Sequence, residues 1–210
     1  AHKAEEIRRG IKAGADSLEH TGLGTAPEFP ADIMQMAAEL NSRLYWDPTV
    51  QPFFMFKDTI ERPDRIDDPR LKQDLPPDIY KDVRQSLAHP SALEYWRMGL
   101  RRLPTLKRKL DQIRESGATI VVGTDAGVPL NFNFDATWRE LDAMVRLGMS
   151  PMEAIQAATM WPGLMLKQPD LGTLAVGHLA DIIVIDGDPL VDITSLRHVV
   201  HVVKDGKQFK

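Results

Sequence analysis

The chain has 210 residues, of which 43% are hydrophobic and 27% are charged, a balance typical of one large or two small folded domains. A formal net charge of -4 without a long run of one sign argues against nucleic acid or an anionic membrane as the main partner. The lack of cysteine excludes a disulfide scaffold and thiol catalysis, but leaves the cellular compartment open.

The first 50 residues alternate helical and strand patterns. Apolar side chains recur at helical spacing up to Gly14, which favours a helix end, and Pro30 favours a helix start. Short connections between such elements are typical of right-handed βαβ units, so we expect a parallel sheet. The predicted elements are helices over residues 4–13 and 31–40 and strands over residues 15–20 and 43–47.

This alternation breaks between residues 50 and 116, which we interpret as an insertion. Residues 50–90 are rich in proline, aspartate and aromatic residues and are too long for a plain connection, so we expect a lid or binding loop. Helical segments follow over residues 91–100 and 104–116. The aromatic cluster at residues 53–56 either packs the insertion onto the body or covers a substrate pocket.

The last third of the chain begins with another buried strand and ends in a β-rich tail. The strand is a short, β-branched apolar run over residues 118–122. Ser150, Pro151 and Glu153 form a capping-box pattern with proline at the first helical position. The further predicted elements are helices over residues 137–147, 151–159 and 161–167 and strands over residues 172–174, 181–186 and 199–204.

Three side chains of metal-ligand type follow predicted strands: His2, His20 and Asp125. If these strands are parallel neighbours in a barrel, their carboxyl ends meet at one rim, where ligands bind. Neutral imidazole and carboxylate are ligands of hydrolytic zinc sites, and a carboxylate beside an activated water can accept its proton. The alternatives are a hydrogen-bonded structural role for each histidine and a turn or helix-capping role for Asp125.

Several motifs in order resemble the second half of a metal-dependent amidohydrolase barrel and its carboxyl-terminal segment. The similarity is closest to the branch of imidazolonepropionase-like enzymes and metal-dependent Xaa-Pro and Xaa-Arg dipeptidases. The matching stretches are Ala1 and His2, residues 13–20 (AGADSLEH), 47–49 (DPT), 122–127 (VGTDAG), 171–181 (LGTLAVGHLAD) and 186–190 (DGDPL).

The resemblance implies an α/β fold in two parts. Residues 1–168 would form strands five to eight of a (β/α)8 TIM-type barrel, with the insertion at about residues 50–116. Residues 169–210 would be a β-rich segment belonging to a small β-sandwich. We expect these 210 residues to be a fragment of a longer protein, because four strands cannot close an eight-stranded barrel.

The resemblance also implies a role for each candidate ligand. His2 would be the strand-five ligand, His20 the strand-six ligand, and Asp125 the strand-eight ligand and general base. The cofactor would be one or two divalent metal ions, zinc above all, and the reaction hydrolysis of a C–N bond in an amide, cyclic amide or dipeptide. The family's His-x-His pair and its lysine or glutamate ligand have no counterpart here, so we expect the chain alone to bind metal poorly and to be inactive.

Two other functions are compatible with the same motifs. His2 and Glu5 have the His-x-x-Glu form of a deaminase of the same superfamily, although Glu5 is equally a first-turn helix residue. A non-catalytic assembly or scaffold protein on this fold is the second alternative. Metal content separates the scaffold from the enzymes, and a substrate panel separates the deaminase from the amide hydrolase.

The expected partner is a small-molecule amide or peptide, with no nucleic acid, no membrane span in this chain, and homo-oligomerisation left open. No apolar run approaches 18 residues, and no basic-then-apolar leader is present. The basic stretch over residues 97–109 is expected to be a solvent-exposed helix face. Candidate substrate contacts are Tyr45 and Trp46, with Arg62 and Arg65 as candidate partners of a peptide carboxylate.

Overall fold

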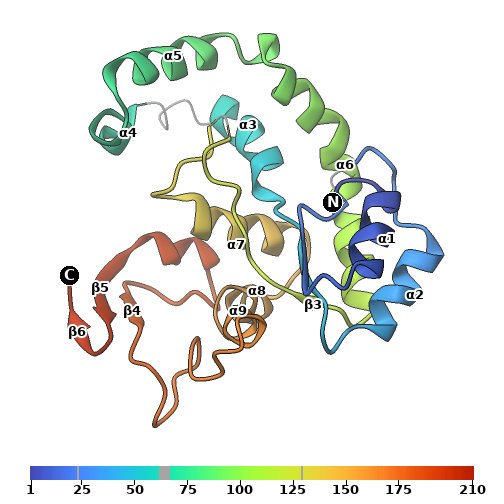
Figure 1. Cartoon of the computed structure of the whole chain (residues 1–210). Helices are drawn as coiled ribbons and strands as arrows, with labels where there is room; N and C mark the ends of the chain where they lie inside the picture. Colours follow the sequence, from blue (N-terminus) through green and yellow to red (C-terminus); the bar gives the residue numbers. More distant parts are fainter. Residues whose placement is uncertain (23, 62–66, 129) are drawn as a thin grey trace.

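A computed structural model describes residues 1–22, 24–61, 67–128 and 130–210. At its centre is a three-stranded sheet made of β1 (Ser17–Glu19), β2 (Tyr45–Asp47) and β3 (Thr119–Ile120), in the order β1-β2-β3. Both pairs are parallel, with Leu18 beside Trp46 and Trp46 beside Ile120 (Figure 1). The predicted parallel sheet is therefore confirmed, with strands shorter than the apolar runs that predicted them.

Helices α1 (Ala4–Lys12) and α2 (Ala31–Glu39) flank this sheet (Figure 1). The start of α1 is fixed by Glu6, whose carboxylate accepts hydrogen bonds from the backbone N–H groups of His2 and Lys3 at 2.8 and 3.0 Å. Ile7 on α1 and Ile33 on α2 are fully buried, so each helix packs an apolar stripe into the core, as predicted.

The insertion is mostly helical in the part that the structure describes. The prediction of a loop was wrong for these residues, because proline here opens helices: Pro69 and Pro77 are first residues of helices, where the missing N–H costs nothing. A lid or binding role of residues 50–90 stays a prediction. The elements are α3 (Gln51–Glu61), α4 (Pro69–Asp74), α5 (Pro77–Ala88), the 3-10 turn η2 (Pro90–Ala92) and α6 (Glu94–Glu115).

Helix α6 is continuous, and the prediction of two separate helices around residue 104 was wrong. Pro104 lies inside α6 on its exposed face. Proline removes one helical hydrogen bond, but the opposite face of the same helix buries Leu106, Leu110 and Ile113. This packing keeps the helix unbroken. In Figure 1, α5 and α6 form an arch that runs from α4 to the sheet.

The predicted helices after Asp125 are confirmed to within one or two residues. They are α7 (Ala136–Arg146), α8 (Pro151–Ala158) and α9 (Met160–Met165). The capping box is formed as expected, because Ser150 Oγ accepts from the N–H of Glu153 at 3.2 Å and Glu153 Oε2 accepts from the N–H of Ser150 at 2.7 Å.

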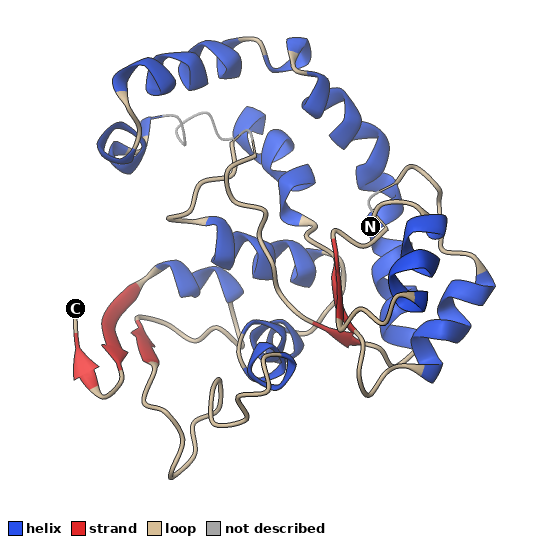
Figure 2. Cartoon of the chain, in the orientation of Figure 1, coloured by secondary structure: helices blue, strands red, loops and turns tan. Residues whose placement is uncertain are grey.

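The carboxyl-terminal segment forms a second, antiparallel sheet. It consists of β4 (Ile182–Ile185), β5 (Val199–Lys204) and β6 (Lys207–Gln208), with the 3-10 turn η3 (Ile193–Arg197) between β4 and β5 (Figure 2). The strand predicted over residues 172–174 was wrong, because Gly172 takes a positive φ of 75° in a turn. Exposed apolar side chains mark this segment, namely Leu174, Val176, Leu179, Ile183, Val184, Leu190, Val191, Val200 and Phe209.

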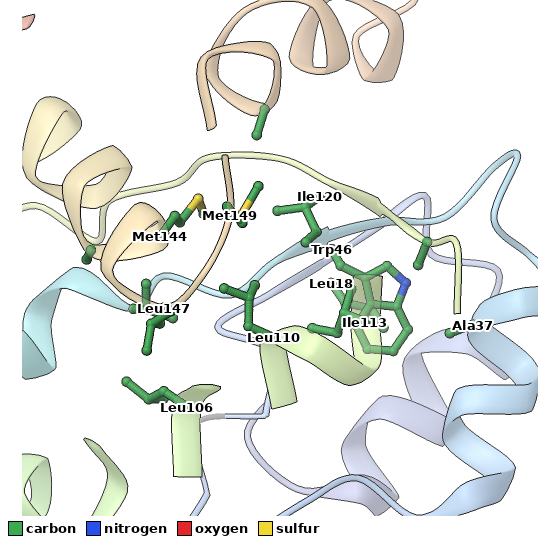
Figure 3. Packing of buried hydrophobic residues seen from close by; sticks show 14 of the residues in the cluster. Leu18, Ala37, Trp46, Leu106, Leu110, Ile113, Ile120, Met144, Leu147 and Met149 are labelled. Carbon is green, nitrogen blue, oxygen red and sulfur yellow. The ribbon is translucent and has the colours of Figure 1, made fainter. Parts of the chain in front are cut away.

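The main core joins the parallel sheet to α6 and α7 (Figure 3). Trp46 is fully buried at its centre, with the ring of Phe29 edge-on at 6.0 Å between centroids. Ile193 of η3 is buried in the same cluster and ties the antiparallel segment to α7. No helix among the described residues is long and apolar enough to cross a membrane.

Candidate metal centre

The structure places His20 close to Asp125, and the ring of His2 beside the ring of His20. Nε2 of His20 lies 3.8 Å from Oδ1 of Asp125, and the rings of His2 and His20 stack with centroids 6.1 Å apart and an interplanar angle of 23°. His20 follows β1 directly, and Asp125 follows β3 on the neighbouring loop. The two outer strands of the parallel sheet, β1 and β3, thus bring His20 and Asp125 to the same edge of the sheet.

Unusual backbone conformations mark this edge of the sheet. His20, Thr49 and Asp125 have φ values of 55°, 46° and 50°, the left-handed region that residues with a Cβ rarely adopt. Each of the three follows a different strand of the sheet. Strained backbone persists where surrounding contacts enforce it and gathers at functional sites, so this clustering supports a site at the strand ends.

A carboxylate network holds the three strand ends in register. Asp47, at the end of β2, accepts hydrogen bonds at Oδ1 from the N–H and hydroxyl of Thr49, at 3.0 and 2.8 Å. It also bonds the backbone N–H of Gly123 and the carboxyl of Glu19. Glu19 precedes His20, and Gly123 stands two residues before Asp125. Asp47 therefore links both ligand-bearing loops from the central strand.

The carboxyl groups of Glu19 and Asp47 interact, and the interaction shifts their pKa values in opposite directions. Burial raises the pKa of Asp47 to about 7, and the neighbouring Glu19 carboxyl adds to that rise. Burial also disfavours the charge on Glu19, but its hydrogen bonds with Asp47 and Ser17 hold the pKa of Glu19 below its usual range. Asp47 is thus the member that carries the proton and donates it to Glu19.

The imidazole of His2 is kept neutral by its surroundings. Partial burial lowers the pKa of His2, with further lowering from Arg102 and His20, while Glu6 acts in the opposite direction. Neutral imidazole is the form that binds a metal ion. The lowered pKa therefore suits His2 to the predicted role.

Lys109 of α6 supports the loop that follows His20. It is buried, and its ammonium donates hydrogen bonds to the carbonyl oxygens of Gly22 and Gly24 at 2.7 and 2.6 Å and to the hydroxyl of Thr105 at 3.1 Å. Burial lowers the pKa of Lys109 to about 8. The prediction that residues 97–109 form a solvent-exposed face was thus wrong for Lys109, because three oxygen acceptors compensate its burial.

The donor set fits a divalent metal in chemistry, but not as a complete site. Two imidazoles and a carboxylate are ligands that zinc and related ions prefer. Nδ1 of His20 is buried with no hydrogen-bond partner among the described residues. Within residues 1–22, 24–61, 67–128 and 130–210, however, no three His, Cys, Asp or Glu side chains converge closely enough to hold an ion. The residues present fit part of a metal site, centred on His20 and Asp125.

Other residues singled out from the sequence have varied positions. Trp46 is fully buried in the core and Tyr45 is partly exposed beside it, so the burial of Trp46 is explained by packing, and their contact with substrate stays a prediction. Arg62 and Arg65 lie outside the described residues. Glu5, which a deaminase would use, is exposed and pairs with Arg9 at 3.1 Å.

Two residues of α6 near the site had no recognisable sequence pattern. Arg102 lines a cavity of about 360 Å³ together with His2 and Lys109. Tyr95 lies within electrostatic range of both Asp125 and Arg102, since burial and the charge of Asp125 raise its pKa and Arg102 acts in the opposite direction. Both residues belong to the insertion, and the direction in which α6 runs across the fold places them near the site. Spacing along the sequence does not reveal that direction.

The chain matches the sequence profile of the amidohydrolase family over residues 2–209. It is 40% identical over 104 residues to ochratoxinase of Aspergillus niger, an alignment covering 46% of this chain and 20% of that protein. It is 31% identical over 83 residues to imidazolonepropionase of Streptomyces griseus subsp. griseus, covering 40% of this chain and 20% of the relative.

A solved structure with the same fold is a Xaa-Pro dipeptidase with methionine bound in its active site. It superposes on all of this chain with a TM-score of 0.70 at 31% identity, and the match covers 43% of the dipeptidase. The chain therefore spans less than half the length of this structural relative. The profile match over nearly all residues and the agreement in fold show that the chain belongs to the amidohydrolase family.

Proposed function

We propose that the full-length protein hydrolyses a C–N bond in a small amide or peptide with the help of a divalent metal, and that His20, Asp125 and His2 form part of its metal site. The observation that carries this proposal is the approach of His20 to Asp125 at 3.8 Å, at the carboxyl ends of two strands of one parallel sheet. Hydrolases among the relatives, namely ochratoxinase and the Xaa-Pro dipeptidase, support the reaction class.

The residues have distinct proposed tasks. His20 and His2 would hold the ion through neutral ring nitrogens, and Asp125 would bind it through one carboxylate oxygen. Bound there, a divalent metal ion supplies polarisation of the amide carbonyl and a water of lowered pKa. Asp125 would accept the proton of the attacking water and deliver it to the leaving amine nitrogen.

The network around Asp47 would position these groups. Asp47 ties Glu19, which precedes His20, to Gly123, which stands two residues before Asp125. It shares this task with Lys109, which fixes the loop after His20. Neither residue needs to touch substrate in order to affect the reaction, because a displacement of about 1 Å at a ligand is enough to slow it.

The domain assignment is part of the same proposal. Residues 1–168, with the insertion at about 50–116, would contribute strands to a (β/α)8 barrel, and residues 169–210 would contribute to a small β-sandwich. The parallel order β1-β2-β3 and the separate antiparallel sheet β4-β5-β6 support this division. The helical insertion supports it too, because α6 returns the chain from β2 to β3 in a parallel connection.

The test is hydrolysis by the full-length, metal-loaded protein. A panel of N-acyl amino acids, dipeptides and cyclic amides is compared with aminated purines and pyrimidines. Release of a free amine from amides, abolished by a chelator and restored by zinc, is the expected result. Ammonia release from the aminated heterocycles alone would support the deaminase instead, and no turnover together with no bound metal would support a scaffold.

A further inference from the structure

Arg102 lies near the candidate site and forms no ion pair with any residue that the structure describes. Its Nε is buried and has no hydrogen-bond partner among the described residues. Its guanidinium stands over the ring of Phe53, with 5.8 Å between Cζ and the ring centroid, which supports the group from one face. A buried guanidinium nitrogen without an acceptor is costly, because it has lost water and gained nothing in exchange.

The cavity that Arg102 lines holds more cations than acids. This cavity of about 360 Å³ also carries Lys3 and Lys109, and burial together with the charge of Arg102 lowers the pKa of Lys109. The acidic residue lining this cavity is Glu28, which pairs with Arg108 at 3.5 Å. Within the part of the chain that the structure describes, no carboxylate lies within 4.0 Å of Arg102. The cavity is therefore short of negative charge.

The same cavity touches one of the candidate metal ligands. His2 is one of its lining residues, and Arg102 contributes to the lowered pKa of His2. Tyr95, two helical turns earlier on α6, lies near both Asp125 and Arg102. Residues seven apart lie on one face of a helix, so this face of α6 runs along the site from Asp125 to His2.

We infer that Arg102 is a specificity-determining residue that pairs with a carboxylate on the substrate, so that the protein prefers amides bearing a free carboxylate to neutral amides. This inference rests on the proposed function, which supplies the reaction. The preference for a carboxylate is argued from Arg102 alone. Guanidinium binds carboxylate through two parallel N–H···O bonds, which supply both charge and orientation. An N-acyl amino acid or a dipeptide carries that carboxylate close to its scissile amide, as the closeness of Arg102 to His2 requires.

The test compares two substrates and three variants of the full-length, metal-loaded protein. The substrates are an N-acyl amino acid and its carboxamide, which differ only in the charged group. Arg102→Gln removes the cation, and Arg102→Lys keeps the charge but cannot form two parallel N–H···O bonds with one carboxylate. Arg101→Gln is the matched control, because Arg101 is the exposed neighbour on the same helix.

We expect the wild type to prefer the acid, and Arg102→Gln to lower kcat/KM for the acid about 10- to 100-fold while changing that for the carboxamide less than about 3-fold. Arg102→Lys should fall between the two, and Arg101→Gln should match the wild type. Equal losses on both substrates, or no loss on either, would overturn the inference.

A binding measurement separates this inference from the proposed function. Titration calorimetry of the metal-free protein with the N-acyl amino acid and with its carboxamide reports the contact without turnover. Tighter binding of the acid, lost in Arg102→Gln, supports the inference even if no amide is hydrolysed. Equal binding of both compounds, unchanged in the variant, rejects it even if hydrolysis is observed. If Arg102→Gln does not fold, two other measurements test the inference: acid binding by Arg102→Lys, and protection of Arg102 in the wild type from modification by phenylglyoxal. Weaker binding of the acid by Arg102→Lys and protection by the acid but not by the carboxamide support the inference, and the absence of both rejects it.

Discussion

Gly123 lies directly against Asp47: a Cβ placed on Gly123 would come within 1.9 Å of Oδ2 of Asp47. Asp47 ends β2 and Gly123 lies in the loop after the neighbouring strand β3, and the Gly123 N–H donates to the Asp47 carboxylate. Only a residue without a side chain allows this contact, so the absence of a Cβ at residue 123 sets how closely the Asp125 loop approaches β2.

Gly123→Ala is therefore expected to displace the Asp125 loop, because hydrogen bonds with Thr49 hold the Asp47 carboxylate in place. We expect this displacement to weaken metal binding by the full-length protein at least about 10-fold. Gly14→Ala is the control. Its φ of 79° makes alanine strained, at about 1 kcal/mol, but no atom lies within 4 Å of the added Cβ. Metal titration and denaturant unfolding of both variants check this, and equal effects on metal affinity would refute the account.

Lys109→Met is expected to lower the free energy of unfolding by about 2–4 kcal/mol, because it leaves the carbonyls of Gly22 and Gly24 without their donor. Lys107→Met, two residues away, removes an exposed ion pair with Asp111 of 2.8 Å and should cost less than about 1 kcal/mol. Urea unfolding of the two variants measures the difference. Similar losses would show that the buried contacts of Lys109 add nothing.

Glu140 on α7 should make stability depend on pH. It is fully buried, its two carboxylate oxygens accept from the N–H groups of Val50 and Gln51 at 2.7 and 2.8 Å, and burial raises its pKa from 4.5 to about 8. The folded state then holds a proton that the unfolded state has released. The contribution of Glu140 is complete below pH 4.5 and is lost as the pH rises through about 8.

Glu140→Gln removes this dependence and replaces one acceptor by a donor, at a cost of about 1–3 kcal/mol near pH 5. The difference in unfolding free energy between wild type and variant should therefore shrink from pH 5 to pH 8. Urea unfolding at several pH values measures it. A constant difference would mean that Glu140 titrates alike in the folded and unfolded states, and a growing one that folding lowers its pKa; either result contradicts this prediction.

Elements could be predicted from the sequence where local sequence patterns and tertiary packing favour the same structure. The capping box at Ser150 and Glu153 and the parallel sheet followed from motifs that act within a few residues or at strand ends. The closeness of His20 and Asp125 agrees with their places at strand ends, while their role as ligands stays a prediction. The insertion was predicted less well. Pro104 would end a helix by local rules, and only the burial of Leu110 and Ile113 on the opposite face explains why α6 continues.

The supporting contacts of the site could not be predicted, because they join residues far apart in the sequence. Lys109 looks like any lysine of an exposed basic helix until the loop after His20 lies over it. Asp47 was part of a recognised motif, but its interaction with the carboxyl of Glu19 depends on the register of β1 against β2. Such networks arise from topology rather than from local spacing.

The most direct test of the central claim is the metal content of the purified full-length protein and of two variants, His20→Ala and Asp125→Asn. We predict at least one tightly bound divalent ion per wild-type chain by elemental analysis, and a loss of at least half of it in each variant with the far-UV circular dichroism unchanged. Wild-type protein without bound metal after zinc loading, or variants that keep all of it while folded, would contradict the assignment of His20 and Asp125 as ligands.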